Sequence, residues 1–143
     1  MTVLMHLSDL HFGAHDPVVC AAVQRLAQRL GVAMVVVSGD LTQRATAEQF
    51  EQAARFVQGL HARSNLVLAG NHDSVATLNE SRDILAFLKT TVVASAGHAP
   101  FILPQRDGTP GAIFCPVPFL RPRELVTSQA GHSGGEKQQL LLN

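Results

Sequence analysis

The chain has 143 residues, a length typical of one domain with its own hydrophobic core. Equal numbers of basic and acidic residues leave no net charge, which excludes a basic field over the whole protein but not a local basic patch. The two cysteines have no metal-ligand spacing, and no apolar run approaches the roughly 18 residues of a membrane span. We therefore expect a protein of a reducing compartment, the cytoplasm, with no membrane segment.

Three short apolar runs in the first half of the chain predict β-strands. They cover residues 3–7, 33–37 and 66–69. The first run begins almost at residue 1, so we expect it to form a central strand. The second is rich in valine without polar alternation, which is typical of a parallel strand covered on both faces. Helical patterns between the runs complete a strand–helix–strand–helix–strand order, which predicts an α/β fold on a parallel sheet.

Two amphipathic stretches separate these strands. Asp16 followed by Pro17 favours the start of the first helix, and Gly31 favours its end. Thr46 and Gln49 have the spacing of a capping box and favour the start of the second helix. The expected buried faces are Val19, Val23, Leu26 and Leu30 in the first helix, and Phe50, Ala54, Val57 and Leu60 in the second.

The second half of the chain predicts a helix, a further strand and a hairpin. Thr77 and Glu80 have capping-box spacing, and they favour a third helix with Ile84, Leu85 and Leu88 on its buried side. Residues 90–94 are expected to form a strand, and residues 101–103 and 112–114 to pair across a proline-rich and glycine-containing turn.

The C-terminal region suggests an incomplete domain. Ser133 and Glu136 have capping-box spacing, so we expect a helix from about residue 134. That helix has barely begun when the chain stops at Asn143 after three leucines and no cap. We therefore expect a single domain over residues 1–143 that is truncated at its C-terminus.

Polar residues follow each of the three early strands. Because the carboxyl ends of parallel strands meet at one edge of a sheet, we expect these side chains to lie together. Carboxylate and imidazole ligands suit manganese, iron or zinc better than calcium. For a single strand end, ordinary turn residues would explain the pattern, but three such ends favour a metal site. The candidate ligands are Asp9, His11, Asp40 and Asn71.

His72 and Asp73 are the candidate catalytic residues. His72 comes directly after the ligand Asn71, so we expect it beside the metal site and not in it. There it could protonate a leaving alkoxide or stabilise transition-state charge, with Asp73 orienting its ring. With two ions, which clamp a phosphoryl group and activate water, these residues would hydrolyse a phosphoester.

The three motifs resemble the first signature blocks of the calcineurin-like metallophosphoesterases. They are Asp9-x-His11, Gly39-Asp40 and Gly70-Asn-His-Asp73. The resemblance implies a four-layer αββα fold and a site of two divalent metal ions. The family takes further ligands from a Gly-His block and a Gly-His-x-His block. This chain has Gly97-His98 and Gly131-His132 but no Gly-His-x-His. We therefore expect the N-terminal portion of the fold, with weak metal binding and poor catalysis.

Residues from about 66 to 142 closely resemble the SbcD family, the nuclease subunits of bacterial SbcCD complexes. The matching segments are residues 70–82, 91–100, 118–123 and 128–131. This resemblance implies a manganese-dependent DNA exonuclease and endonuclease of DNA repair and recombination. It also implies a coiled-coil ATPase partner of the SbcC type and a homodimer of the nuclease subunit. In that family His98 and His132 lie in segments that are not ligand blocks, so we expect both to be loop histidines.

Residues 1–60 look more like the small stand-alone phosphodiesterases of the same superfamily. Leu10 stands where SbcD-type chains usually have tryptophan, and Leu41-Thr-Gln-Arg44 replaces their Phe-Asp after the second block. Two alternatives therefore stay open: a stand-alone phosphodiesterase acting on a small or cyclic nucleotide, and an inactive truncated or recombined fragment.

Three arginines are candidates for binding a phosphate backbone. Arginine suits the geometry of phosphate, and most protein–DNA hydrogen bonds go to phosphate and sugar. The candidate arginines are Arg44, Arg121 and Arg123.

His6 lies on the first predicted strand. We expect it to be a core histidine whose hydrogen bonds are satisfied, and not a metal ligand.

Overall fold

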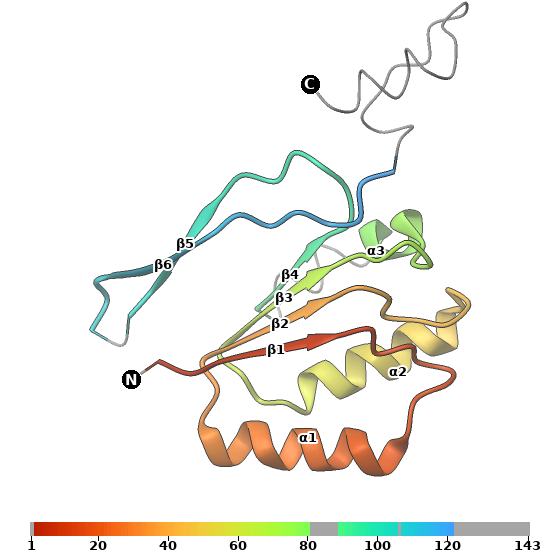
Figure 1. Ribbon diagram of the computed structural model, residues 1–143, viewed down its shortest axis with the longest axis horizontal. Helices are drawn as coiled ribbons and strands as arrows, with labels where there is room; N and C mark the ends of the chain where they lie inside the picture. The colour runs from red at the N-terminus through yellow and green to blue at the C-terminus, as the bar shows by residue number, and fades with distance from the viewer. Residues whose placement is uncertain (1, 81–88, 106, 122–143) are drawn as a thin grey trace, which may run out of the picture.

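A four-stranded parallel sheet forms the centre of the computed structural model, which describes residues 2–80, 89–105 and 107–121 (Figure 1). The strands lie side by side in chain order, and their carboxyl ends share one edge of the sheet. The parallel α/β architecture predicted from the sequence is confirmed. The strands are β1 (Leu4–Ser8), β2 (Met34–Ser38), β3 (Ser64–Leu68) and β4 (Thr90–Val93).

The predicted position of the first strand was wrong. Within the described residues, β1 pairs with β2 alone and is an edge strand of the sheet. Its residues alternate between exposed and half-buried, whereas β2 is buried along most of its length. That alternation is typical of a strand with one open face. It indicates the position of a strand in the sheet better than an early place in the chain does. His6 belongs to the exposed set and is not a core residue, although its Nε2 lies 2.8 Å from Ser38 Oγ.

Two helices cover one face of the sheet (Figure 1). Helix α1 (Pro17–Leu30) begins at Asp16, whose carboxylate accepts a 2.8 Å hydrogen bond from the amide of Val18, and it ends at Gly31 as predicted. Helix α2 (Ala47–Gln58) begins at Thr46, whose side chain accepts a hydrogen bond from the Gln49 amide. The other half of the predicted capping box is replaced, since the Gln49 side chain accepts from the amide of Arg44.

The buried face predicted for α1 was largely wrong. Val19, Leu26 and Leu30 are 57%, 40% and 49% exposed. The residues that pack against the core are the smaller Cys20, Val23 and Ala27, at i, i+3 and i+7. The helix carries apolar residues on more than one side, so the prediction, which relied on the larger aliphatic side chains, selected the wrong face. In α2, Phe50 and Val57 pack as predicted and Leu60 is buried just beyond its end, but Ala53 and Phe56 are buried instead of Ala54.

The position of Cys20 leads to a test of this packing. Burial raises the pKa of the Cys20 thiol, and the charge of Asp16 raises it further, whereas Cys115 is exposed. Because the thiolate is the reactive form, Cys115 should react with iodoacetamide at pH 8 at least about tenfold faster than Cys20. Peptide mass spectrometry would give both rates, with Cys20→Ser as the control for assignment. Equal rates would contradict the packing of α1.

A β-hairpin lies over the opposite face of the sheet (Figure 1). Strands β5 (Phe101–Pro104) and β6 (Pro110–Phe114) pair in antiparallel fashion, which confirms the predicted hairpin. Its side chains Phe101, Leu103 and Phe114 pack against a small buried cluster on this face of the sheet, formed by Met34, Leu66 and Val93.

The described part of the third helix, α3 (Val75–Glu80), begins earlier than predicted. Ser74 accepts a hydrogen bond from the amide of Thr77, so Thr77 lies inside the helix and does not cap it. Ser74 directly follows the polar motif after β3, which hid its capping role. The predicted inward residues Ile84, Leu85 and Leu88, and the helix predicted from about residue 134, lie outside the described residues. Among the described helices, none is long and apolar enough to cross a membrane.

Candidate metal centre

The loops after β1 and β2 run alongside each other and carry three of the candidate ligands. The amide of Asp9 donates to the carbonyl of Ser38 at 3.0 Å, and the amide of His11 donates to the carbonyl of Asp40 at 3.0 Å. The amide of Phe12 continues the series by donating to Leu41 at 2.9 Å. The pairing of the two strands therefore extends into their loops, and it fixes the Asp9–His11 segment beside Asp40.

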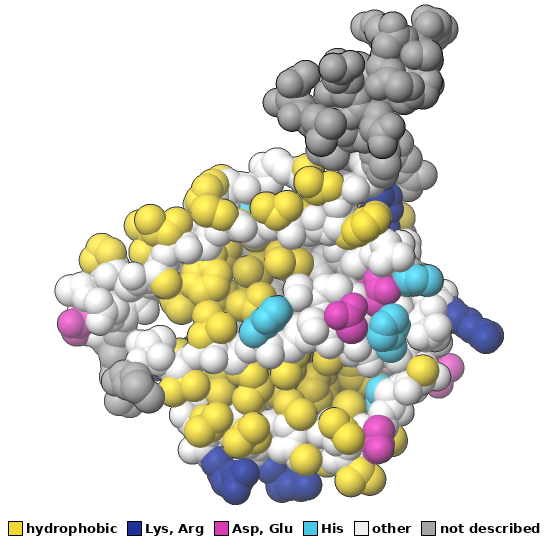
Figure 2. Space-filling model, in the orientation of Figure 1, with side chains coloured by type: hydrophobic (Ala, Val, Ile, Leu, Met, Phe, Trp, Pro, Cys, Tyr) yellow, Lys and Arg dark blue, Asp and Glu magenta, His cyan; other side chains and the backbone are white. Residues whose placement is uncertain are grey.

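Asp9, His11 and Asp40 form a compact cluster at the carboxyl edge of the sheet. Each offers one ligand atom, and these atoms all lie within 4.8 Å of one another. Asp40 is buried, His11 is half-buried and Asp9 is exposed, so the cluster opens to solvent on one side. Figure 2 shows acidic and histidine side chains gathered at this edge.

The backbone at two of these residues is left-handed. His11 has φ 45°, in the left-handed region that L-residues other than asparagine and aspartate seldom adopt, and Asp9 has φ 53°, a conformation that aspartate tolerates better. Such a conformation costs about 1–2 kcal/mol per residue and tends to occur at functional sites. The two left-handed residues flank Leu10, and their side chains lie in one cluster with Asp40, as a metal site requires.

The donor set fits a divalent metal ion. His11 Nδ1 is buried and has no hydrogen-bond partner among the described residues. A buried polar atom without a partner is costly, and coordination to a metal would remove that cost. A cation bound between the two carboxylates and the imidazole would also offset the negative charge of the buried Asp40. One nitrogen and two carboxylate ligands suit manganese, iron or zinc.

Two glycines allow the strand ends to approach closely. Gly39 has φ 70°, and a side chain there would also collide with the carboxylate of Asp9. A Cβ atom at Gly70 would lie 2.6 Å from the backbone nitrogen of Asp40. The loop after β3 can therefore lie against the ligand Asp40 because both contact residues lack a Cβ.

That approach places His72 beside Asp40. The amide of His72 donates to Asp40 Oδ1 at 3.0 Å, and His72 Nε2 lies 3.9 Å from Asp40 Oδ2. The His72 side chain is 54% exposed, so its ring stands at the open rim of the cluster. Asn71, the fourth candidate ligand, is exposed next to it in the same turn.

Asp73 lies beneath the turn and holds it to the loop after β2. One carboxylate oxygen accepts hydrogen bonds from the amides of Leu41 and Gly70, both at 3.0 Å. The other accepts from the amide of Thr42 at 3.1 Å and from its hydroxyl at 3.0 Å. Asp73 is 3% exposed, so this carboxylate is satisfied by four donors in the interior. The contacts of Asp73 thus join two loops of the site.

Comparison with known proteins agrees with this geometry. The profile of the calcineurin-like phosphoesterase family matches residues 2–115, which include Asp9, His11, Asp40 and the Gly70–Asp73 turn. The chain belongs to the calcineurin-like phosphoesterase family. Its parallel α/β sheet is consistent with the N-terminal part of the metallophosphoesterase fold expected from the sequence.

Two curated relatives are similar to this phosphoesterase chain. They are the SbcD subunits of the SbcCD nuclease in Escherichia coli strain K12 and in Escherichia coli O157:H7. Each is 51% identical over an alignment of 152 positions, which covers 97% of this chain and 38% of the relative. The similarity to SbcD therefore extends into residues 1–60, which the sequence had linked to stand-alone phosphodiesterases. The chain spans less than two fifths of the length of these relatives.

The two candidate phosphate-binding arginines within the described residues differ in exposure and in their contacts. Arg44 is exposed in the loop after β2, four residues beyond Asp40. Arg121 is half-buried and donates to backbone carbonyls of the Gly70–Asp73 turn. Arg123 and His132 lie outside the described residues, whereas His98 lies in a loop with its Nδ1 2.9 Å from the carbonyl of Ala99.

Sequence reasoning missed Thr42. This residue is fully buried, and its hydroxyl both donates to Asp73 and accepts from the amide of Ala45. It stands two residues after Asp40, in a segment that the sequence identified simply as a loop. The available signal was a hydroxyl residue directly after a ligand block, since such residues often bond to nearby backbone.

Proposed function

We propose that this chain carries the N-terminal part of a metal-dependent phosphodiesterase site, of the DNA nuclease type found in SbcD. The observation that carries the proposal is the compact cluster of Asp9, His11 and Asp40 at the strand ends of a phosphoesterase-family chain. The identity to the SbcCD nuclease subunits supports DNA as the substrate class. A role in DNA repair and recombination and a cytoplasmic location rest on that likeness to SbcD and are part of the same proposal.

Asp9, His11, Asp40 and Asn71 would hold two divalent metal ions, with manganese as the proposed metal. Such ions supply Lewis acidity and an activated water for attack on phosphorus. In the proposed step, water adds its oxygen to phosphorus and the ester P–O bond breaks. His72, at the exposed rim beside Asp40, delivers a proton to the departing ester oxygen. The Asp73 carboxylate accepts hydrogen bonds from Leu41, Thr42 and Gly70, and so keeps the turn that bears His72 in place.

The partners are proposed by the same likeness. We infer a coiled-coil ATPase of the SbcC type and a homodimer of the nuclease subunit as the assembly of the whole protein. Within this chain, the arginines Arg44, Arg121 and Arg123 remain proposals for contact with a phosphate backbone. Of the two arginines within the described residues, Arg44 is more accessible than Arg121, since it is exposed in a loop of the site.

Hydrolysis of a chromogenic phosphodiester by the purified chain tests the function. With manganese and bis-p-nitrophenyl phosphate, we expect turnover. On a short duplex DNA, whose departing alkoxide needs a proton, His72→Ala should lower the rate by at least about 100-fold, as removal of a general acid typically does. His61→Asn is the matched control, because His61 is exposed outside the cluster and asparagine accepts its left-handed backbone, φ 53°. Equal rates in His72→Ala and the unchanged chain would contradict the role of His72.

The same preparation separates the alternatives. Linear duplex DNA and a cyclic nucleotide, tested side by side with manganese, distinguish a nuclease from a stand-alone phosphodiesterase. An absence of turnover on every substrate would favour the third alternative, an inactive truncated or recombined fragment.

A further inference from the structure

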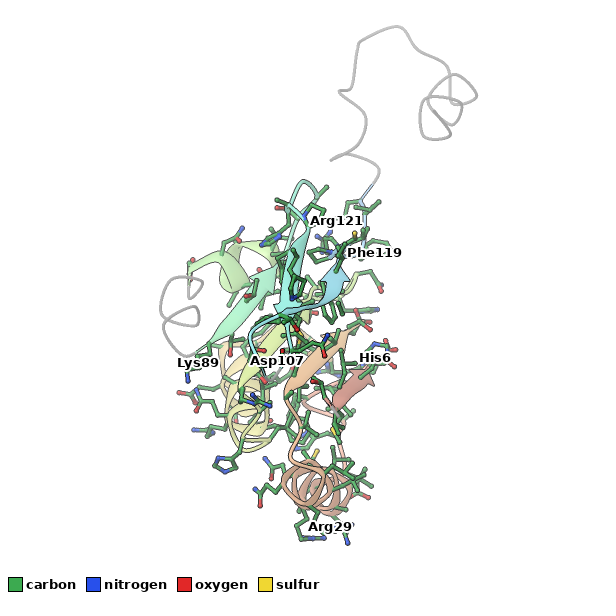
Figure 3. All side chains as sticks on the ribbon, turned by 90° about the vertical axis from the view of Figure 1, so that its left-hand side faces the viewer. His6, Arg29, Lys89, Asp107, Phe119 and Arg121 are labelled. Carbon is green, nitrogen blue, oxygen red and sulfur yellow. The ribbon has the colours of Figure 1, made fainter. Side chains whose placement is uncertain are left out.

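The extended segment after β6 crosses the turn that bears His72. The amide of Phe119 donates to the carbonyl of Ala69 at 2.9 Å, just before the turn begins. Two residues further on, Arg121 Nη2 donates to the carbonyl of Asp73 at 2.9 Å and to that of Gly70 at 3.5 Å. Figure 3 shows Phe119 and Arg121 near each other, far from Arg29 of α1, which covers the opposite side of the sheet.

We propose that Arg121 is a positioning residue of the metal centre, which holds the Gly70–Asp73 turn so that His72 stays beside Asp40. This inference rests on the proposed function and deepens it. It assigns Arg121 a role through the protein's own backbone, in addition to the phosphate contact proposed for it above.

The geometry favours this role because Arg121 joins both ends of the turn. One guanidinium nitrogen donates to the first carbonyl of the turn and to the last, so it fixes the distance across the four residues. Hydrogen bonds from a charged donor are stronger than neutral ones, and partial burial of Arg121 strengthens them further. The side-chain nitrogen thus stabilises a turn whose two middle residues are Asn71 and His72.

The turn is held from two directions. The Asp73 carboxylate joins it to the loop after β2 through Leu41 and Thr42, and Arg121 joins it to the segment after β6. Each contact uses a different group of Asp73, since the side chain accepts the first set and the carbonyl accepts from Arg121. Loss of Arg121 would therefore leave the first contact intact while it frees the carbonyl side of the turn. A local effect on Asn71 and His72 is expected, without unfolding of the sheet.

Hydrogen exchange of the metal-free chain tests the inference independently of catalysis. The probes are the amides of Gly70 and His72, which donate to Asp73 and Asp40 respectively. In Arg121→Ala they should exchange at least about tenfold faster, whereas amides within α1 and α2 should keep their rates. Arg55→Ala is the matched control, because Arg55 is an exposed arginine paired with Glu51 at 3.3 Å. Unchanged exchange at both probes, or an equal increase throughout the chain, would overturn the proposal.

Manganese binding by calorimetry measures the consequence for the site. Arg121→Ala should lower the affinity about tenfold, as changes behind metal ligands typically do, and Arg121→Lys should lower it less because one charged donor remains. Added guanidinium should restore part of the affinity to Arg121→Ala and none to Arg55→Ala. Equal affinities in Arg121→Ala and the unchanged chain would also overturn the proposal. If the unchanged chain binds no manganese, the proposed function fails, and the exchange rates alone decide the role of Arg121.

Discussion

Asp40→Asn is expected to lower the manganese affinity of this chain by more than about 100-fold, since the loss of a residue behind a ligand already costs 10–100-fold. Asp40 is the buried member of the ligand cluster. Asparagine keeps an oxygen to accept the 3.0 Å hydrogen bond from the His72 amide, so the turn should stay in place. The change therefore removes the charge and little else. Isothermal titration calorimetry with manganese would measure the effect.

The stability of the metal-free protein provides a second measurement on the same variant. Without an ion, the Asp40 carboxylate faces that of Asp9 within the same cluster, and like charges repel. Asp40→Asn removes this repulsion, so the metal-free chain should be at least as stable to urea as the unchanged chain. Asp107→Asn is the matched control, because Asp107 is an exposed residue of the hairpin turn. Retained affinity in Asp40→Asn would contradict the assignment of Asp40 as a ligand.

The parallel sheet could be predicted because its signals are local. Each of the first three strands is a short apolar run closely followed by Gly, Asp, His or Asn, and each of the first two helices has its cap in the adjacent loop, at Asp16 and Thr46. The order of strands in the sheet and the buried face of α1 depend on contacts between distant elements. Cys20 and Ala27 face the core because they fit beneath the sheet, which a count of large aliphatic residues does not reveal.

The same distinction applies to the site. Asp9, His11 and Asp40 could be placed together because the carboxyl ends of parallel strands meet at one edge. The partners of Asp73 and Arg121 could not. Asp73 accepts hydrogen bonds from amides that lie 31 and 32 positions earlier in the chain. Arg121 donates hydrogen bonds to carbonyls that lie 48 and 51 positions earlier. Backbone groups carry no signature in the sequence, so side chains that bind them were assigned to catalysis or to substrate.

Asp73→Asn is expected to destabilise the metal-free chain by about 3 kcal/mol, because the carboxylate accepts four hydrogen bonds in the interior and bonds to a charged acceptor contribute about 1.5–3 kcal/mol each. Asparagine has the same shape but can accept with one of its two terminal atoms. If its NH₂ group takes the place of Oδ2, it faces the amides of Leu41 and Gly70, which are both donors. If it takes the place of Oδ1, the Thr42 hydroxyl can rotate to accept, but the Thr42 amide stays without an acceptor.

Either orientation therefore leaves at least one buried N–H group unsatisfied, and the loop after β2 loses its attachment to the turn that bears His72. Urea unfolding followed by circular dichroism would measure the loss, with Asp107→Asn again as the control. Asp107 accepts hydrogen bonds from the hydroxyl and the amide of Thr109, which lower its pKa, but it is exposed, and water replaces those bonds in the variant. If Asp73 served chiefly to orient the ring of His72, Asp73→Asn would lower activity while its unfolding midpoint matched that of Asp107→Asn. A large loss of stability in Asp73→Asn alone would instead identify this carboxylate as the link between the two loops that form the metal centre.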